Sequence, residues 1–295
     1  MTMTDTKTAE AHSIRCPRRP ALRYHGGKWR VAPWIIDHLP AHRVYVEPFG
    51  GAASVLLRKP RSYAEIYNDL DDEVVGLFEV LRDREQSSLL RDRLRLTPFA
   101  RAEFEAAYEE CRDPIERARR LLVRSFMGFG SDGHNPRVTT GFRATSNRSG
   151  TTPAHDWANL ADCLADTSAR LRGVVIERRP AVEVIRQHDG PKTVFYIDPP
   201  YLPETRSTKS RKSGGKYHAY RHEMTREDHA DLAEVLHGLT GMVVISGYDS
   251  ALYQNLFDGW ATRRKQTFAD GAQAREEVLW LNPAAEAALS HGRLL

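Results

Sequence analysis

The amino-acid sequence predicts an α/β protein whose central sheet is mostly parallel. Short apolar runs of strand type alternate with stretches of helical spacing along most of the 295 residues, as expected for parallel strands covered by helices on both faces. The composition, with 41% hydrophobic and 28% charged residues, is that of an ordinary globular protein. This length corresponds to one large domain or to one domain that carries an insertion.

Two strand-to-helix units open the predicted fold. HRVYVEPF has the pattern of a short buried strand, and Gly50 and Gly51 separate it from a helix at about residues 52–57. SYAEIYN predicts a second strand that ends at Asp69, and EVVGLFEVL continues as a helix. The preceding residues 1–20 are polar and lack the apolar core of a signal peptide, so we expect a disordered tail there.

A helical block then interrupts the alternation. Helical spacing extends over about residues 85–127, with Pro98 and Pro114 near helix starts. Because strands resume only after this block and the irregular loop behind it, residues 83–172 are predicted to form a mainly helical insertion. The sheet domain is then expected to comprise residues 21–82 and 173–295.

The irregular part of the insertion, residues 128–155, is rich in Gly, Ser, Thr, Asn and Arg. A G-x-G-x-x-G spacing occurs there at Gly128, Gly130 and Gly133. This spacing follows a helix and not a strand, so it predicts a flexible loop and argues against a dinucleotide-binding dehydrogenase.

The second half of the chain completes the sheet. A helix is predicted over residues 156–171, and GVVIERR and TVFYI follow as strands, the latter leading to Asp198. TREDHADLAEVLHGL predicts a helix with Thr225 as its N-cap. A strand in MVVIS, a helix around ALYQNLF and a closing strand in EEVLWLN then follow.

Composition excludes several classes of protein. No apolar run approaches the roughly 20 residues that span a bilayer. The three cysteines, Cys16, Cys111 and Cys163, are far apart and make neither a disulfide framework nor a zinc pattern. The sequence therefore predicts a cytoplasmic protein without a structural metal.

Positive charge is concentrated in two stretches without acids, one between Asp132 and Asp156 and one between Glu204 and Glu223. Such stretches are either solvated loops or surfaces that contact phosphates. The position of the second stretch directly behind FYIDPPY favours phosphate contact. The basic residues are Arg137, Arg143 and Arg148 in the first stretch, and Arg206, Lys209, Arg211, Lys212, Lys216 and Arg221 in the second.

Three groups of residues stand where predicted parallel strands end, which is where open α/β sheets bind ligands. A glycine turn behind the first strand, at residues 47–51, lets a ligand approach the start of a helix. Asp69, ending the second strand, is placed to hold ribose hydroxyls; a helix cap is the alternative. The third group is Asp198–Tyr201.

The stretch FYIDPPY is the most informative. Two prolines end the strand and stiffen the backbone behind Asp198. An amine on an aromatic base is a poor nucleophile because its lone pair is delocalised into the ring. A carboxylate and a fixed backbone carbonyl can hold its two N–H groups and aim the lone pair at an electrophile, and an adjacent aromatic ring can stack on the base.

With these motifs in place, the chain resembles the Dam-type S-adenosylmethionine-dependent, adenine-specific DNA methyltransferases. The resemblance covers about residues 21–283 and is carried by LRYHGGKW, VEPFGGAASVLL, EIYNDLDDEV and FYIDPPY, in this order. KYHAYRHEMTREDHADLAEVL, VVISGYDS and REEVLWLNP are similar to the family's C-terminal part. The resemblance implies a Rossmann-like methyltransferase sheet, mostly parallel with an antiparallel C-terminal strand, and an inserted helical target-recognition domain.

The resemblance also implies roles for individual residues. Asp198 and the Pro199 carbonyl would hold the adenine amino group, Pro200 would stiffen the turn, and Tyr201 would stack on a flipped base. No metal is required, and the partner is double-stranded DNA. The implied contacts to S-adenosylmethionine are Tyr24, Lys28, Glu47, Phe49, Gly50, Gly51, Asp69 and Asp198, with Lys28 near the methionine end and Asp69 on the ribose.

The chain departs from the family at four positions. Tyr24 stands where tryptophan is frequent, and Ala53 replaces a usual glycine, which its small size should make harmless. In RSFMGFGSDG, Ser125 and Ser131 stand in for asparagines, which read adenine bidentately, so a GATC target is not predicted. Arg124, in the same stretch, is added to the expected DNA contacts.

Two alternatives remain beside DNA adenine methylation. The same Asp-Pro-Pro-Tyr chemistry serves methyltransferases that act on RNA adenine, on DNA cytosine or on a glutamine amide. A DNA-binding relative without catalysis is a second alternative. The intact Lys28, Asp69, Asp198 and Tyr201 argue against it.

Overall fold

The computed structural model describes residues 16–130, 133, 140–144, 151–202, 222–268 and 274–292. Within them a seven-stranded sheet has the order β3-β2-β1-β4-β5-β7-β6. The pairs from β3 to β5 are parallel, and β7 runs antiparallel to both β5 and β6. The strands are β1 (Val44–Glu47), β2 (Ala64–Asn68), β3 (Val174–Glu177), β4 (Thr193–Ile197), β5 (Met242–Gly247), β6 (Ala261–Phe268) and β7 (Ala274–Leu281). The predicted fold class is confirmed.

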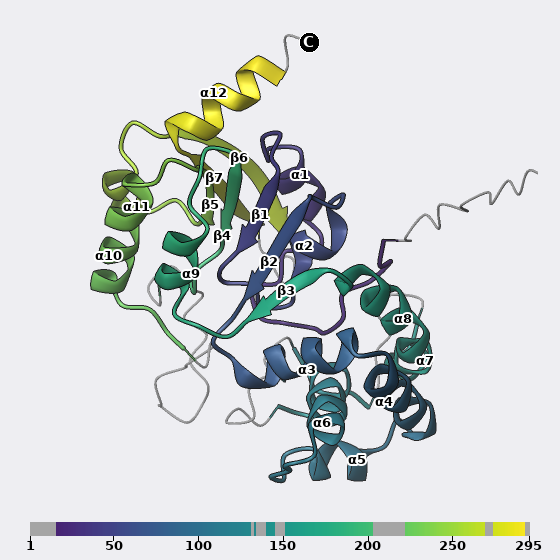
Figure 1. The fold of residues 1–295 in the computed structure, drawn as a ribbon. Helices are drawn as coiled ribbons and strands as arrows, with labels where there is room; N and C mark the ends of the chain where they lie inside the picture. Colours follow the sequence, from purple (N-terminus) through teal and green to yellow (C-terminus); the bar gives the residue numbers. More distant parts are fainter. Residues whose placement is uncertain are drawn as a thin grey trace, which may run out of the picture.

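Helices cover both faces of this sheet (Figure 1). On one side lie α1 (Ala32–Ile36) and α2 (Ser54–Arg58), and on the other lie α9 (Ala181–Gln187), α10 (Arg226–His237) and α11 (Ala251–Leu256). Side chains on a strand alternate between its two faces. Accordingly Tyr196 of β4 packs in the cluster that includes α1 and α2, whereas Phe195 and Ile197 pack in the cluster that includes α9–α11.

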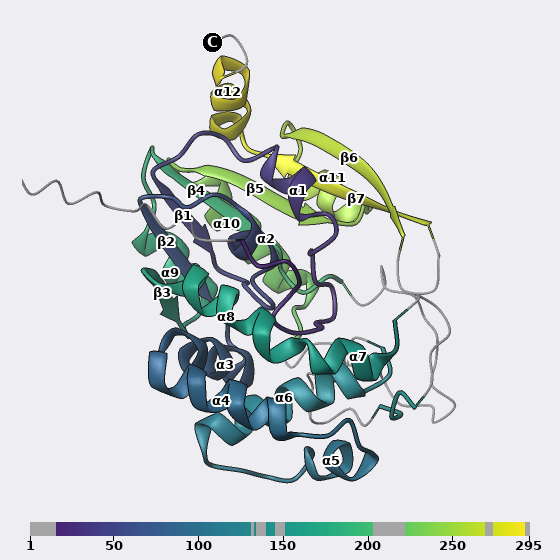
Figure 2. The ribbon, with the colours of Figure 1, turned by 90° about the vertical axis from the view of Figure 1, so that its right-hand side faces the viewer.

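The remaining helices that precede β3 in the sequence gather at one end of the molecule, as a layer beyond β3 (Figure 1 and Figure 2). They are α3 (Asp72–Arg82), α4 (Arg84–Leu96), α5 (Arg101–Ala106), α6 (Pro114–Met127), α7 (Pro153–Ala158) and α8 (Leu160–Leu171). Leu77, Leu90, Leu121 and Leu164 of these helices belong to the same buried cluster as Tyr45 of the sheet. The helical layer and the sheet therefore share one hydrophobic core.

Local sequence signals explain several helix starts. The N-cap of α10 is Thr225, as predicted, and it forms a capping box with Asp228. Pro114 begins α6 directly behind its N-cap Asp113, whose side chain accepts from the Ile115 N–H. The helix expected over residues 156–171 is in fact two helices, α7 and α8, that meet at Asn159.

Four elements were not expected from the sequence: the strand β6, the short helices α1 and α9, and α12 (Pro283–Gly292). β6 is an edge strand whose ATRRKQTF run carries charged side chains, as edge strands often do, and so lacks an apolar pattern. The strand β7 pairs with β6 along its whole length, which makes the C-terminal strand one half of a hairpin.

Two expectations about irregular segments change. Residues 16–20 are placed in the structure: Arg19 donates to the Asp156 carbonyl, 3.0 Å away; residues 1–15 lie outside the described residues. The expected loop is closely packed at Gly128 and Gly133, since a Cβ at either position would overlap the Arg124 carbonyl. These glycines allow the chain to pack tightly on the end of α6.

No helix in the described part of the chain has the length and apolar character to cross a membrane.

Candidate functional site

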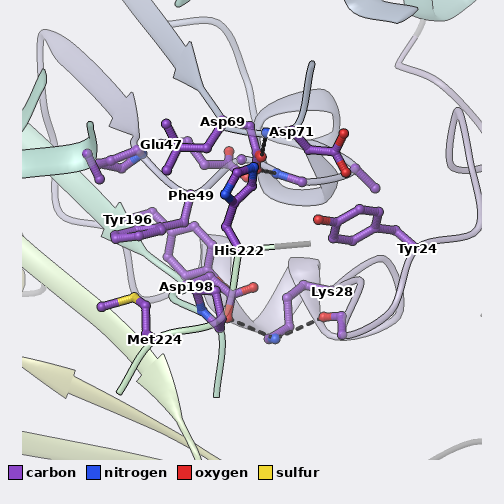
Figure 3. Close-up of a pocket in the computed structure, with 18 of the residues that line it drawn as sticks. Tyr24, Lys28, Glu47, Phe49, Asp69, Asp71, Tyr196, Asp198, His222 and Met224 are labelled. Atoms are coloured by element: carbon purple, nitrogen blue, oxygen red, sulfur yellow. Dashed lines mark hydrogen bonds and ion pairs between the residues drawn. The ribbon is translucent and has the colours of Figure 1, made fainter. Parts of the chain in front are cut away.

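A cavity of about 490 Å³ opens where β1, β2 and β4 end. Its size is typical of sites for small ligands and cofactors. Figure 3 shows Asp69 at one end of the cavity, the Asp198–Lys28 pair at the other, and Tyr24 and Phe49 on opposite sides between them. The lining is formed mainly by residues 24–28, 47–52, 69–71, 180–182, 198, 200, 222–224, 228 and 231.

The wall behind β1 is held by Glu47. This carboxyl is 2% exposed and accepts from the Tyr45 hydroxyl at 2.8 Å and from the Leu56 N–H at 3.0 Å. Burial raises the pKa of Glu47 to about 8, more than these two hydrogen bonds lower it. Glu47 thus fixes the start of α2 against the end of β1, and it lines the cavity as expected.

The glycine turn behind Glu47 is required by close packing. A Cβ at Gly50 would overlap the Tyr67 ring, and a Cβ at Gly51 would lie 2.8 Å from Tyr24 Cε1. Gly51 also has a φ of 45°, in the left-handed region that favours glycine. Ala53 has a φ of 52° in the same region, so replacing the family's glycine there has a backbone cost that its small size does not remove.

Asp69 faces this turn from the end of β2. Its Oδ2 accepts from the Gly51 N–H at 2.7 Å, and its Oδ1 accepts from the Asp71 N–H at 2.8 Å. Burial in the cavity wall raises the pKa of Asp69 to about 6. The side chain that caps α3 is Asp71, which accepts from the Glu73 N–H at 3.0 Å. Asp69 is therefore not the helix cap.

Asn68, one residue earlier, was not singled out from the sequence. Its amide is fully buried and donates to the carbonyls of Pro48 and Arg179, while its oxygen accepts from the Arg179 N–H. These bonds tie the loop behind β1 to the loop behind β3, which carries the lining residues 180–182. Because Arg179 is far along the chain, no local sequence signal could reveal this role.

Asp198 is held at the opposite end of the cavity. Its Oδ1 lies 2.9 Å from Lys28 Nζ and accepts from the Ser246 hydroxyl at 2.8 Å. Lys28 also donates to the Gly26 carbonyl at 3.0 Å. Within the described part of the chain, Asp198 Oδ2 has no hydrogen-bond partner. This second oxygen is therefore available to accept from a ligand.

The other members of the Asp-Pro-Pro-Tyr turn are placed differently. Pro200 lines the cavity, whereas Pro199 and Tyr201 are not among the lining residues. The Tyr201 side chain is buried: its hydroxyl donates to Glu277 Oε1 at 2.5 Å, and Lys28 Nζ lies 4.6 Å from its ring centroid. Glu277 lies on β7, and its Oε1 is 3.8 Å from Lys28 Nζ. This contact links the segment around Lys28 to β7, which is distant from it in the sequence.

The expected DNA contacts divide into three groups. Seven of them lie outside the described residues: Arg137, Arg148, Arg206, Lys209, Arg211, Lys212 and Lys216. Arg143 is half-buried, and its backbone N–H donates to the Met127 carbonyl at 2.8 Å. The expectation for Arg124 is wrong in this structure, because its guanidinium is buried and donates to Glu73 and to the Ala107 carbonyl, both at 2.7 Å.

Ser125 is likewise an internal residue. Its hydroxyl accepts from the Arg23 N–H at 2.7 Å and donates to the Arg23 carbonyl at 2.9 Å. Ser125 thereby fixes the segment before Tyr24 against α6. Ser131 lies outside the described residues. Among the residues whose structure is described, no group of three or more His, Cys, Asp or Glu side chains is placed to hold a metal ion.

Comparison with known proteins gives a consistent result. Residues 24–268 match the family model of the D12 class N6 adenine-specific DNA methyltransferases. The DNA adenine methylase of Escherichia coli K12 is 25% identical over 256 residues, which cover 84% of this chain and 85% of that protein. The DNA adenine methylase of Salmonella typhi is 24% identical over 241 residues, covering 79% and 82%.

Among solved structures, a putative rRNA-methylase from Clostridium thermocellum is similar over 85% of this chain and 94% of that chain, at 10% identity and with a TM-score of 0.36. The family match covers most of the chain and includes the cavity residues from Tyr24 to Asp231. It also selects DNA adenine over the RNA, cytosine and glutamine alternatives. The chain belongs to the D12 class of N6 adenine-specific DNA methyltransferases.

Proposed function

We propose that the cavity binds S-adenosylmethionine. The turn Asp198–Tyr201 then presents the 6-amino group of an adenine to this cofactor, and the adenine is flipped out of a specific site in duplex DNA. The carrying observation is the arrangement of the cavity, which has Asp69 at one end and the Lys28–Asp198 pair at the other. A nucleoside with an amino-acid extension has matching polar groups at its two ends.

The cavity residues suit this cofactor. Asp69 offers carboxylate oxygens at the glycine turn, where ribose hydroxyls can donate to them. Lys28 is a cation with 6% exposure, placed to attract the carboxylate of the methionine end. Phe49, Pro180 and Val182 supply the apolar surface between these ends. Glycine at position 51 leaves room for the Tyr24 ring beside the turn, and both residues line the cavity.

The chain's own residues have a holding role in the reaction. When bound, S-adenosylmethionine supplies a methyl carbon on a positively charged sulfur. Asp198 Oδ2 and the Pro199 carbonyl accept the two N–H groups of the adenine amine, which turns the nitrogen lone pair towards that carbon. A nitrogen that gained a methyl group would carry one surplus proton, and Asp198 would take that proton and pass it to solvent.

The adenine must first leave the duplex, at a cost of a few kcal/mol. We assign the holding of DNA to the two basic stretches, most of whose residues lie outside the described part of the chain. Residues 206–221 are expected to close over the duplex, and residues 133–155 are expected to carry base-reading groups. The inserted helices of residues 83–172 form the target-recognition domain. Of the DNA contacts expected in residues 133–155, Arg143 is the one that lies among the described residues. With DNA as substrate and all three cysteines free, the enzyme is assigned to the cytoplasm.

Labelled S-adenosylmethionine and DNA of mixed sequence test this function. After the reaction, digestion and mass analysis of the nucleosides should show N6-methyladenine alone. Asp198→Ala should abolish transfer and leave DNA binding intact. Asp258→Ala, at an exposed carboxylate that follows α11 and does not line the cavity, is the matched control and should retain full activity. Methylated cytosine as the product, or activity in Asp198→Ala, would overturn the proposal.

A further inference from the structure

The turn behind β4 cannot be fixed by hydrogen bonds of its own. Ladder pairing of β4 with β5 ends at Ile197, and neither Pro199 nor Pro200 has an N–H to donate within the turn. A buried carbonyl without a donor costs free energy comparable to a lost hydrogen bond. A donor from another part of the fold can therefore fix the position of this turn.

His229 supplies that donor for Pro200. Its Nε2 lies 3.1 Å from the Pro200 carbonyl oxygen, and its Nδ1 lies 3.1 Å from the Tyr253 hydroxyl. A carbonyl oxygen can only accept, so Nε2 carries the proton. In the neutral ring Nδ1 is then the acceptor, and the Tyr253 hydroxyl donates to it. The chain of donors runs from Tyr253 through His229 to the turn.

Both side chains are held firmly. His229 is 2% exposed and lies near the start of α10, which the Thr225 capping box anchors. Tyr253 is 4% exposed on α11, and its ring meets those of Phe257 and Trp280 at centroid distances of 5.3 and 5.1 Å. A donor fixed in this way can position the backbone it contacts.

We propose that His229, oriented by Tyr253, is a positioning residue for the Asp198–Tyr201 turn. The inference rests on the proposed role of that turn in holding adenine. In the sequence, the Pro200 carbonyl follows the Pro199 carbonyl and precedes Tyr201. A shift of the Pro200–Tyr201 peptide plane therefore moves both the Pro199 carbonyl and Tyr201. A displacement of about 1 Å in a reacting group can lower the rate by about a hundredfold.

The test compares two substitutions of the same histidine. His229→Gln keeps an amide N–H where Nε2 donates, whereas His229→Leu removes the donor and keeps an apolar side chain. His237→Leu is the matched control: this histidine is on the same helix, and its Nε2 and Nδ1 contact the Leu256 carbonyl and the Trp260 indole, away from the turn. Tyr253→Phe removes only the hydroxyl that orients the ring.

For His229→Leu we expect kcat to fall by about tenfold to a hundredfold, with the Kd for S-adenosylhomocysteine within twofold of wild type. His229→Gln should recover most of this loss, Tyr253→Phe should lower kcat severalfold, and His237→Leu should keep the wild-type kcat. Equal kcat in His229→Leu and His229→Gln, or a wild-type kcat in His229→Leu, would overturn the inference.

If His229→Leu does not fold, Tyr253→Phe decides: a lower kcat with unchanged Kd supports the inference, and an unchanged kcat overturns it. The proposed function fails separately, through activity in Asp198→Ala. A wild-type kcat in His229→Leu together with inactive Asp198→Ala would therefore refute the positioning role alone.

Discussion

The ammonium of Lys28 lies 2.9 Å from Asp198 Oδ1 and 3.8 Å from Glu277 Oε1, so one cation serves two carboxylates, of which Glu277 is buried and Asp198 is partly exposed. Lys28 belongs to the YHGGK segment, Asp198 follows β4, and Glu277 lies on β7. The cluster therefore joins three distant parts of the chain at the proposed catalytic turn. Removing its cation leaves two acids that, among the described residues, have only neutral donors, the hydroxyls of Ser246 and Tyr201.

We expect Lys28→Met to lower the free energy of unfolding by about 3 kcal/mol, because breaking a buried ion pair leaves an uncompensated charge. Urea denaturation at pH 7 measures this loss, and adding Glu277→Gln to Lys28→Met should recover part of it. Arg95→Met, which breaks exposed ion pairs on α4, should change stability little. Equal effects of Lys28→Met and Arg95→Met would show that the buried cluster contributes nothing.

Two glycines give opposite predictions for the same substitution. Gly50→Ala should destabilise the protein by about 1–3 kcal/mol, because its methyl group would overlap the Tyr67 ring. Gly76→Ala, within α3, should stabilise it by about 0.5–1 kcal/mol, because a Cβ there meets no atom within 4 Å and alanine favours helix. Thermal unfolding of both variants checks the pair; a stabilising Gly50→Ala would contradict the packing argument.

The residues that could be predicted from the sequence are those whose position depends on the chain nearby. Glu47, Asp69 and Asp198 each follow an apolar strand pattern, so their place at the cavity needs only the rule that parallel strands end together. The predicted N-cap Thr225 is equally local, since a cap depends on the first turn of its own helix.

Ser246 and His229 could not be predicted, because their roles depend on sheet register and helix packing. Ile197 pairs with Ile245 across β4 and β5, which sets the next residues, Asp198 and Ser246, side by side. Nothing in VVISGYDS reveals that register. His229 similarly stands on α10 with the spacing of any core residue, and only the packing of α10 beneath the turn gives its imidazole a partner.

Binding of the cofactor should depend on pH through Asp69. Burial raises the pKa of this carboxyl to about 6, so it is ionised at pH 8 and protonated at pH 5. The ionised form is the better acceptor for ribose hydroxyls, and we expect the affinity for S-adenosylhomocysteine to fall as the pH drops below about 6. Isothermal titration calorimetry between pH 5 and pH 8 measures the change.

Asp69→Asn is the control for this pH dependence. The amide cannot ionise, so the variant should bind about tenfold more weakly at pH 8, equivalent to about 1.4 kcal/mol, and its affinity should vary little between pH 5 and pH 8. If the affinity of Asp69→Asn for S-adenosylhomocysteine varied with pH as in the wild-type protein, a group other than Asp69 would be responsible for the pH dependence.

DNA binding should weaken steeply with salt. If the two basic stretches neutralise about five phosphates, the logarithm of the association constant should fall against the logarithm of the salt concentration with a slope near −4.5. Each lysine or arginine replaced in these stretches should reduce the slope by about 1. Arg124→Gln should leave the slope unchanged, because that guanidinium is buried against Glu73. Fluorescence anisotropy with a labelled duplex across a salt series measures each slope; a slope near zero for the wild-type protein would remove the basic stretches from the interface.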